Sequence, residues 1–230
     1  MTHSTQAEIA FPDPETALDD PNGLLATGGD LSIDRLKFAY QHGIFPWFNS
    51  DEEAILWWCP DPRAILYPTE LKIHRSMRKF IRATTLRITF DTAFEAVVQA
   101  CQQPRKKQMG TWITSSMKAA YTELHAAGFA HSVEVWDGET LVGGLYGTSF
   151  GKMFFGESMF STSSNASKYA LISLVTHLTR WSFNLIDCQI MNNHLASLGA
   201  REIPRKEFLD LLTLNRQLTT HSGKWQFTSC

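Results

Sequence analysis

Three short apolar runs in the middle of the chain are separated by turn-forming residues. The runs cover residues 132–136, 140–146 and 152–160. Asp137-Gly138 separates the first two and Phe150-Gly151 the last two, and such pairs are typical of the tight turns of β-hairpins. Because strands joined by short turns run antiparallel, this pattern predicts an antiparallel three-stranded meander.

The hydrophobic period changes after residue 165, where a helix is predicted. Its apolar residues recur at spacings of three and four, namely Leu171, Leu174, Val175, Leu178 and Trp181. The residues before it, Ser163, Ser164 and Asn165, are of the types that cap helix N-termini. A further apolar run at 185–190 predicts a buried strand, and it places Asp187 and Gln189 on the same face. An acid and an amide together on a buried strand are candidates for chemistry.

The first part of the chain differs in composition from the rest. Residues 1–62 are rich in proline, glycine and aromatic residues and predict a small lobe, followed by a larger domain at 63–230. The lobe contains a helix whose apolar side begins at Ile33 and which ends at Gly43. Trp47 lies between this helix and a second aromatic cluster. Burial in the core is the alternative to a binding role for this tryptophan.

A second predicted helix, at 71–83, carries one apolar and one basic side. No acidic residue occurs between residues 71 and 90. A basic stripe without carboxylates favours contacts with phosphates, although a simple solvated face is the alternative. The candidate phosphate-binding residues on this stripe are Lys72, Arg75, Arg78, Lys79 and Arg82.

The remaining pattern completes an α+β fold, a mixed sheet flanked by helices. Thr114 or Ser115 caps a helix that ends at Gly128. A short helix at 192–198, a short strand at 201–203 and a final helix at 205–214 follow the buried strand.

The composition limits the classes of protein to which the chain can belong. With 230 residues and 43% hydrophobic residues the chain can bury a full core, and it contains no apolar run long enough to span a membrane. The 4 cysteines and 8 histidines show no metal-ligand spacing. We therefore expect a cytoplasmic protein without a metal or other cofactor. Residues 1–62 hold 2 basic and 11 acidic side chains, whereas residues 63–230 hold 19 and 12, so a polyanion is expected to bind the second part.

The order of elements, with the late stretch Asn192 to Ala200, resembles a GNAT-type acyltransferase. In that superfamily the junction between strand and helix carries a glycine-rich turn that holds the pyrophosphate of coenzyme A. The corresponding junction here, residues 160–168, contains no glycine. A different activated acyl carrier is therefore expected, and a coenzyme A-dependent N-acetyltransferase remains the alternative enzyme.

Closer motifs resemble the bacterial leucyl/phenylalanyl-tRNA–protein transferases, from about Phe11 to Arg216. The matching segments include Gly43-Ile-Phe-Pro-Trp47, Pro60-Asp-Pro-Arg63, Gly110-Thr-Trp-Ile-Thr114, Gly156-Glu-Ser-Met-Phe-Ser161, Leu185-Ile-Asp-Cys-Gln189 and Ser197-Leu-Gly-Ala200. The resemblance implies a monomeric cytoplasmic enzyme that moves Leu or Phe, with Met as a further candidate, from aminoacyl-tRNA to proteins that begin with Arg or Lys. The product would be marked for degradation. A non-catalytic RNA-binding module is the alternative from another class.

The chemistry implied is aminolysis of the tRNA ester, for which Asp187, Gln189 and Glu157 are the candidate catalytic residues. The amide oxygen of Gln189 can accept a hydrogen bond from the attacking amine. Asp187 would fix or polarise Gln189 or bind the ammonium group, and support of the backbone is its alternative role. Glu157 would meet the basic side chain of the acceptor, or else cap the helix that follows it. Asn192 is a further candidate to bind the acceptor or the donor.

The resemblance also implies sites for the aminoacyl group and the terminal adenine. Candidates for the aminoacyl pocket are Leu145, Phe154, Phe155 and Met159. Because strand residues alternate in direction, at most one of the two phenylalanines lines that pocket directly. Trp47 and Trp112 correspond to family positions that stack on or enclose the adenine. The basic stripe would hold phosphates of the acceptor stem without reading sequence.

Overall fold

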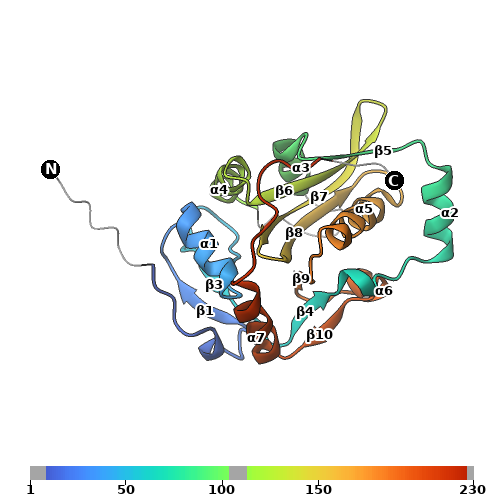
Figure 1. Ribbon diagram of the computed structural model, residues 1–230. Coiled ribbons are helices and arrows are strands. Elements are labelled where there is room, and N and C mark those ends of the chain that lie inside the picture. Colours follow the sequence, from blue (N-terminus) through green and yellow to red (C-terminus); the bar gives the residue numbers. More distant parts are fainter. Residues whose placement is uncertain (1–8, 104–112, 227–230) are drawn as a thin grey trace.

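The computed structural model describes residues 9–103 and 113–226, and helices cover both faces of a mixed β-sheet (Figure 1). This architecture confirms the predicted α+β class. In spatial order the large sheet contains β10 (Arg201–Ile203), β4 (Arg63–Leu66), β9 (Leu185–Gln189), β8 (Met153–Ser161), β7 (Thr140–Phe150), β6 (Ala130–Asp137) and β5 (Arg87–Phe90). The described helices are α1 (Ile33–Gln41), α2 (Arg75–Ala83), α3 (Phe94–Cys101), α4 (Ser115–Ala126), α5 (Ala166–Arg180), α6 (Asn193–Ser197) and α7 (Arg205–Asn215), with 3-10 turns at Pro14–Thr16 and Pro68–Glu70.

Strands β6, β7 and β8 form the antiparallel meander that the turn-forming pairs predict. Strand β9 joins β8 in parallel, because α5 crosses between them and returns the chain in the same direction. Helix α5 packs closely on β7, where a side chain at Gly143 would place its Cβ only 2.5 Å from Cβ of Ala166. The small residue is therefore required for this contact.

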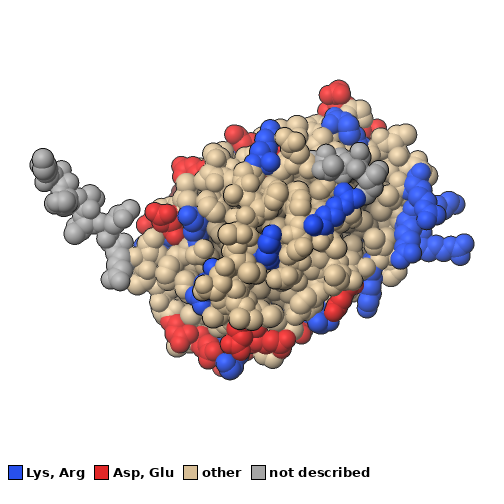
Figure 2. Space-filling model, in the orientation of Figure 1, with Lys and Arg blue, Asp and Glu red and all other residues tan. Residues whose placement is uncertain are grey.

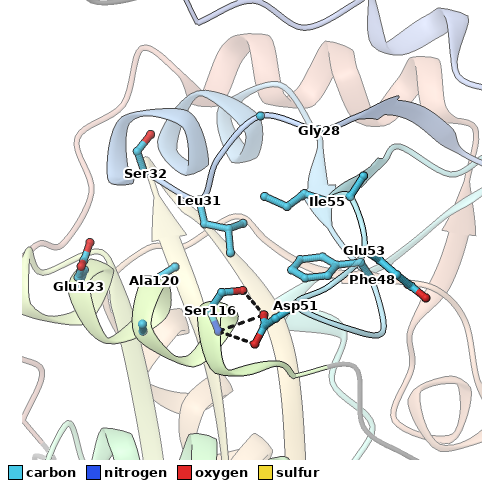
Figure 3. Close-up of a pocket in the computed structure, with 13 residues that line it drawn as sticks. Gly28, Leu31, Ser32, Phe48, Asp51, Glu53, Ile55, Ser116, Ala120 and Glu123 are labelled. Carbon is cyan, nitrogen blue, oxygen red and sulfur yellow. Dashed lines mark hydrogen bonds between the residues drawn. The ribbon is translucent and has the colours of Figure 1, made fainter.

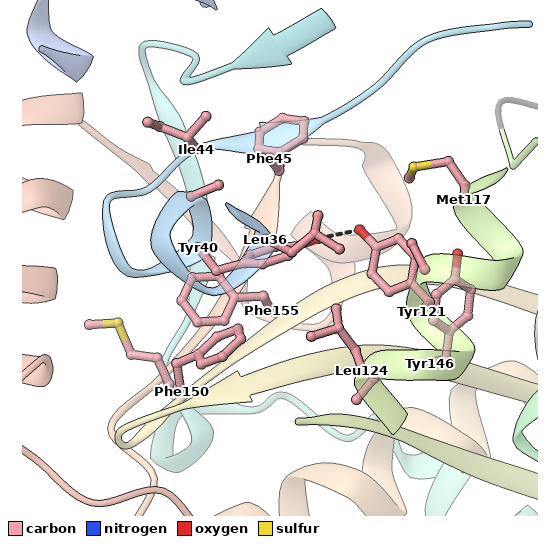
Figure 4. Packing of buried hydrophobic residues seen from close by; sticks show 14 of the residues in the cluster. Leu36, Tyr40, Ile44, Phe45, Met117, Tyr121, Leu124, Tyr146, Phe150 and Phe155 are labelled. Carbon is pink, nitrogen blue, oxygen red and sulfur yellow. Dashed lines mark hydrogen bonds between the residues drawn. The ribbon is translucent and has the colours of Figure 1, made fainter. Parts of the chain in front are cut away.

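The small lobe shares its core with the large sheet. Its described part contains α1 and a three-stranded sheet of β1 (Leu24–Thr27), β3 (Leu56–Trp58) and β2 (Phe45–Pro46). Leu36, Tyr40 and Phe45 from this lobe belong to the same buried cluster as Tyr121 of α4 and Phe155 of β8 (Figure 4). A second cluster, on the opposite face of the sheet, lies under α5.

Two expectations about helix starts require correction. Helix α2 begins at Arg75 rather than near residue 71, because residues before it pair with the end of α6: the Lys72 amide donates to the Leu198 carbonyl (2.8 Å). At α5, Asn165 adopts a left-handed conformation and its side chain makes no capping bond. The Ser167 amide instead donates to the hydroxyl of Ser161 (3.4 Å).

Strands β1, β2, β3 and β5, helix α3 and the position of Trp225 were not predicted. The Trp225 ring stacks on that of buried His131, with centroids 3.7 Å apart. The Trp225 amide also donates to Asp91 (2.6 Å), which fastens the C-terminal segment to the sheet. Within the described residues, none of the helices is both long and apolar enough to cross a membrane.

Candidate active site

A cavity opens where β8 and β9 separate. The two strands pair from Met153 opposite Leu185 to Phe155 opposite Asp187, and the paired register ends there. Beyond that point lies a cavity of about 510 Å³. Its lining includes apolar side chains from both strands and from α5, together with the polar side chains of Tyr146, Glu157, Ser158, Gln189, Asn192 and His194.

Glu157 lies at the junction of three parts of the fold. Its carboxylate accepts hydrogen bonds from the hydroxyls of Tyr40 in α1 (2.7 Å) and Tyr121 in α4 (3.0 Å), and the two hydroxyl oxygens lie in close contact with each other. The Gln189 side-chain amide donates to the same carboxylate at 3.3 Å. Burial raises the pKa of Glu157 to about 7. Of these partners only Gln189 lines the cavity. None of the three belongs to α5, so Glu157 does not cap that helix.

Gln189 is held in a backbone conformation that is unusual for its residue type. Its φ is 62°, in the left-handed region that side chains other than glycine seldom adopt. The Gln189 backbone N–H donates to the Asp187 carboxylate at 2.9 Å. This hydrogen bond satisfies the N–H group at the end of strand β9. The side-chain amide then points to Glu157, so Gln189 and Glu157 lie side by side on the cavity wall.

Asp187 is completely buried and does not line the cavity. It forms a bidentate ion pair with Arg63 of β4, with Nε–Oδ1 2.8 Å and Nη2–Oδ2 2.6 Å. The guanidinium group lies over the rings of Phe45 and Phe208. The Asp187 carboxylate thus accepts hydrogen bonds from the guanidinium group of Arg63 and from the backbone amide of Gln189.

The structure separates the four candidates for an aminoacyl pocket. Leu145, Phe154 and Met159 line the cavity. Phe155 does not; it points to the opposite face of the sheet and packs against Tyr40 (ring centroids 5.3 Å apart). This is the alternation that two successive strand residues must show.

The candidates for adenine binding are only partly described. Trp47 is 40% exposed, and its ring lies 5.6 Å from that of Trp58, centroid to centroid. It is therefore not a core residue, unlike buried Trp57. Trp112 lies outside the described residues. Asn192 lines the cavity while its side-chain oxygen accepts from the Leu195 amide (2.9 Å) and caps α6.

The basic stripe projects from α2, at the end of the molecule away from the small lobe (Figure 2). All five candidate residues, Lys72, Arg75, Arg78, Lys79 and Arg82, are exposed. In the described part of the chain none of them forms an ion pair with an acid. The stripe thus presents uncompensated positive charge to solvent.

Several residues of the site were passed over by sequence reasoning. Tyr40 and Tyr121 fall on the apolar sides of their helices, so the pattern gave no sign that their hydroxyls meet Glu157. Arg63 could have been suspected, because a buried acid requires a cationic partner. Tyr146 and His194 gave no signal; each lines the cavity with a buried polar atom that lacks a hydrogen-bond partner among the described residues. Burial lowers the pKa of His194.

A cavity in the opening of a mixed sheet, with an apolar part and a carboxylate and an amide hydrogen-bonded to each other, fits a transferase site. Comparison with known families agrees. The family model described as leucyl/phenylalanyl-tRNA protein transferase matches residues 65–213, and that of the N-terminal domain of the same family matches residues 29–61. The chain belongs to this family and is an aminoacyltransferase.

Similar proteins cover almost the whole chain. The leucyl/phenylalanyl-tRNA–protein transferase of Pseudomonas syringae pv. syringae (strain B728a) is 57% identical over 93% of this chain and 93% of its own length. That of Pseudomonas fluorescens (strain Pf0-1) is 54% identical over 96% and 98%. A solved structure titled as L-PGS from Bacillus licheniformis shows only a distant likeness, with a TM-score of 0.39 at 10% identity over 70% of this chain and 52% of that one. Membership in an enzyme family overturns the alternative of a non-catalytic RNA-binding module.

Replacing Arg63 with Met is expected to lower the free energy of unfolding by about 3–5 kcal/mol, because it leaves the buried Asp187 carboxylate without its partner. A matched control is Arg201→Met, since Arg201 also approaches an acid, Glu70, at 2.6 Å but both side chains are about half exposed. The control should lose less than about 1 kcal/mol. Urea denaturation measures both, and equal losses would contradict the role given to burial.

The raised pKa of Glu157 predicts a change of stability with pH. Because the folded protein favours the protonated carboxyl, this stabilisation is complete below the usual pKa of 4.5 and is lost as the pH rises through about 7. Between about pH 5 and about pH 8, wild type should therefore lose on the order of 1–2 kcal/mol relative to Glu157→Gln. Urea midpoints of both proteins across this range test it. Parallel pH curves for wild type and Glu157→Gln would refute the shift.

Proposed function

We propose that this enzyme transfers a leucyl or phenylalanyl group, with methionyl as a further donor, from tRNA to the α-amine of a protein that begins with Arg or Lys. The observation that supports this most directly is the placement of Glu157. Its carboxylate is on the cavity wall beside the apolar lining of Leu145, Phe154 and Met159. One site can therefore receive an apolar acyl group and a cationic acceptor together.

In this proposal Glu157 binds the basic side chain of the acceptor. A carboxyl with a pKa of about 7 is only partly ionised when the site is empty, and a bound guanidinium or ammonium group would favour its ionised form. The hydroxyls of Tyr40 and Tyr121 hold this carboxylate in place. An acceptor with a neutral first side chain would gain no such ion pair, and this difference would favour Arg and Lys.

Gln189 is proposed to orient the attacking amine. Its side-chain N–H bonds to Glu157, while its amide oxygen has no hydrogen-bond donor among the described residues and is available to accept from the amine. Free α-amines have a pKa of about 7.7–8.0, so a substantial fraction is already neutral at physiological pH. Orientation rather than a strong base is therefore the main requirement.

The reaction then needs few groups. The amine nitrogen bonds to the acyl carbon, the ester bond to the ribose oxygen breaks, and a proton passes from the amine to that oxygen. Asp187 is proposed as a positioning residue, because Arg63 and the Gln189 amide engage its carboxylate. Asn192, on the same wall, is proposed to hydrogen-bond the acceptor or the donor. Trp47 and Trp112 are proposed to hold the terminal adenine.

The transfer assay separates this proposal from the coenzyme A alternative. Phe-tRNA labelled in the amino acid is incubated with a peptide that begins with Arg, and separately acetyl-labelled coenzyme A is offered with the same peptide. Label should pass from the tRNA to the peptide, and Gln189→Ala should reduce kcat by about 10²-fold through loss of orientation. Matched control peptides begin with Ala or carry an acetylated N-terminus. Label that remains on the tRNA, or passes from coenzyme A, would contradict the proposal.

The stripe on α2 is proposed to bind phosphates of the tRNA acceptor stem. Arg75→Gln with Lys79→Gln should weaken tRNA binding and lower the slope of log K against log salt concentration by about 2, one for each phosphate that the variant no longer neutralises. The matched control is Lys206→Gln on α7 with Arg216→Gln at the C-cap of that helix, which removes the same charge away from α2. Binding titrations at several salt concentrations measure the slopes. Equal slopes for both double variants would show that only net charge matters.

A further inference from the structure

Two buried polar atoms without a hydrogen-bond partner belong to side chains that line the cavity between β8 and β9. Such atoms are rare in folded proteins, because each loses its bonds to water without gaining another. In the described part of the chain six side chains carry one, and two of the six, Tyr146 and His194, line this cavity. A bound substrate can therefore complete the hydrogen bonds that these two groups lack.

Another cavity, of about 540 Å³, provides a contrast. It lies between the small lobe and α4 (Figure 3), and it shares no lining residue with the cavity between β8 and β9. Its Asp51 is already bonded to Ser116 at the start of α4 (Figure 3). Among the described residues that line it, none has a buried side-chain polar atom without a partner. Unmet hydrogen-bonding capacity thus distinguishes the candidate active site from this cavity.

Tyr146 and His194 belong to opposite faces of the sheet. Tyr146 is completely buried in the cluster that also contains the two tyrosines bonded to Glu157. His194 lies on α6, and Leu198 at the end of that helix belongs to the cluster under α5, together with Phe154. Because Phe154 is a proposed contact of the acyl group, His194 lies on the side of the cavity that the donor would occupy.

Helix α6 also borders the basic side of the molecule. The ring of His74, the residue before α2, bonds to the Ser197 carbonyl of α6 at 3.0 Å. Burial, together with the positive charge of nearby Lys168 on α5, lowers the pKa of His194, so its ring is neutral at physiological pH. A neutral imidazole carries one N–H. Next to a positive charge, a ligand oxygen is favoured at Nε2 over an ammonium group, and Nε2 is then the nitrogen that donates.

We propose that His194 is a catalytic residue, which donates a hydrogen bond from its Nε2–H to the ribose oxygen that leaves when the tRNA ester is cleaved. This inference rests on the proposed function, because it takes the acyl group to lie beside Phe154. As the amine nitrogen bonds to the acyl carbon, the electron pair of the broken C–O bond passes to the ribose oxygen. The hydrogen bond stabilises this growing negative charge. The amine supplies the proton that the oxygen finally takes, so His194 keeps its own proton, as a neutral imidazole donor must.

The test compares two donors that differ in the leaving group. Phe-tRNA is prepared with a 3′-terminal 2′-deoxyadenosine or 2′-fluoro-2′-deoxyadenosine, and since both lack the 2′-hydroxyl, the ester stays on the 3′ oxygen. The fluorine withdraws electrons and makes that oxygen a better leaving group. With saturating donor and a peptide that begins with Arg, His194→Leu should lower the single-turnover rate of the deoxy donor by about 10²-fold. The loss should be about three- to tenfold smaller for the fluoro donor, whose leaving oxygen needs less stabilisation.

Two amide variants give the matched comparison with natural Phe-tRNA. Gln places a side-chain N–H close to the position of the histidine Nε2, whereas Asn is one methylene shorter and does not reach it. His194→Gln should therefore restore much of the rate, and His194→Asn should stay close to His194→Leu. The control His42→Leu removes a partly buried histidine of the small lobe whose pKa is also lowered by burial. It should keep the wild-type rates with all donors.

A merely structural role for His194 would slow both modified donors equally, so equal losses would overturn this proposal. Equal rates for His194→Gln and His194→Asn would do so too, as would a higher KM for the donor with an unchanged rate at saturation. In these cases wild type still moves Phe to the peptide, and the proposed function stands. If wild type moves Phe from none of the tRNAs, including the natural one, the proposed function fails and this inference fails with it.

Discussion

The ion pair between Arg63 and Asp187 fixes the strand end on which the active site is built. Removing two charges from water costs several kcal/mol per ion, and only close, well-aligned hydrogen bonds offset that cost. Here both contacts are shorter than 3 Å, and Phe45 and Phe208 enclose the guanidinium. The pair therefore joins β4 and β9 to the small lobe and to α7. A displacement of Asp187 would move the Gln189 backbone, because the two are hydrogen-bonded.

Glu157 connects the small lobe to the candidate active site. Its two hydroxyl partners come from α1 in the lobe and α4 in the larger domain, while Glu157 itself is on β8. A carboxylate at the meeting point of three elements depends on the position of each of them. The lobe thus belongs to the active site as well as to the shared hydrophobic core, and a shift of α1 would alter both the placement of this carboxylate and the burial that raises its pKa.

Sequence patterns predicted the parts of the fold that depend on neighbouring residues. The meander, α5 and β9 follow from turn residues and hydrophobic period, and the family motifs single out Gln189 and Glu157 as residues of one site.

The Arg63–Asp187 pair spans 124 positions, so no local pattern contains it. Tyr40 and Tyr121 were recognised as helix residues with apolar neighbours, but only packing reveals that their hydroxyls converge. Strand β5 and α3 were missed, and the start of α2 was misplaced because its preceding residues bond to the distant α6.

The division of charge along the chain fits an enzyme with two partners of opposite sign. A net charge of −2 would suggest little electrostatic preference, yet the acids concentrate in the lobe and the basic stripe projects from α2 at the other end (Figure 2). Charges separated by more than a Debye length of about 8–10 Å are largely screened from one another at physiological salt. A polyanionic donor and a cationic acceptor can therefore each be attracted to its own surface. In the proposed function, a cationic side chain of the acceptor at the cavity between β8 and β9 would favour the ionised form of Glu157.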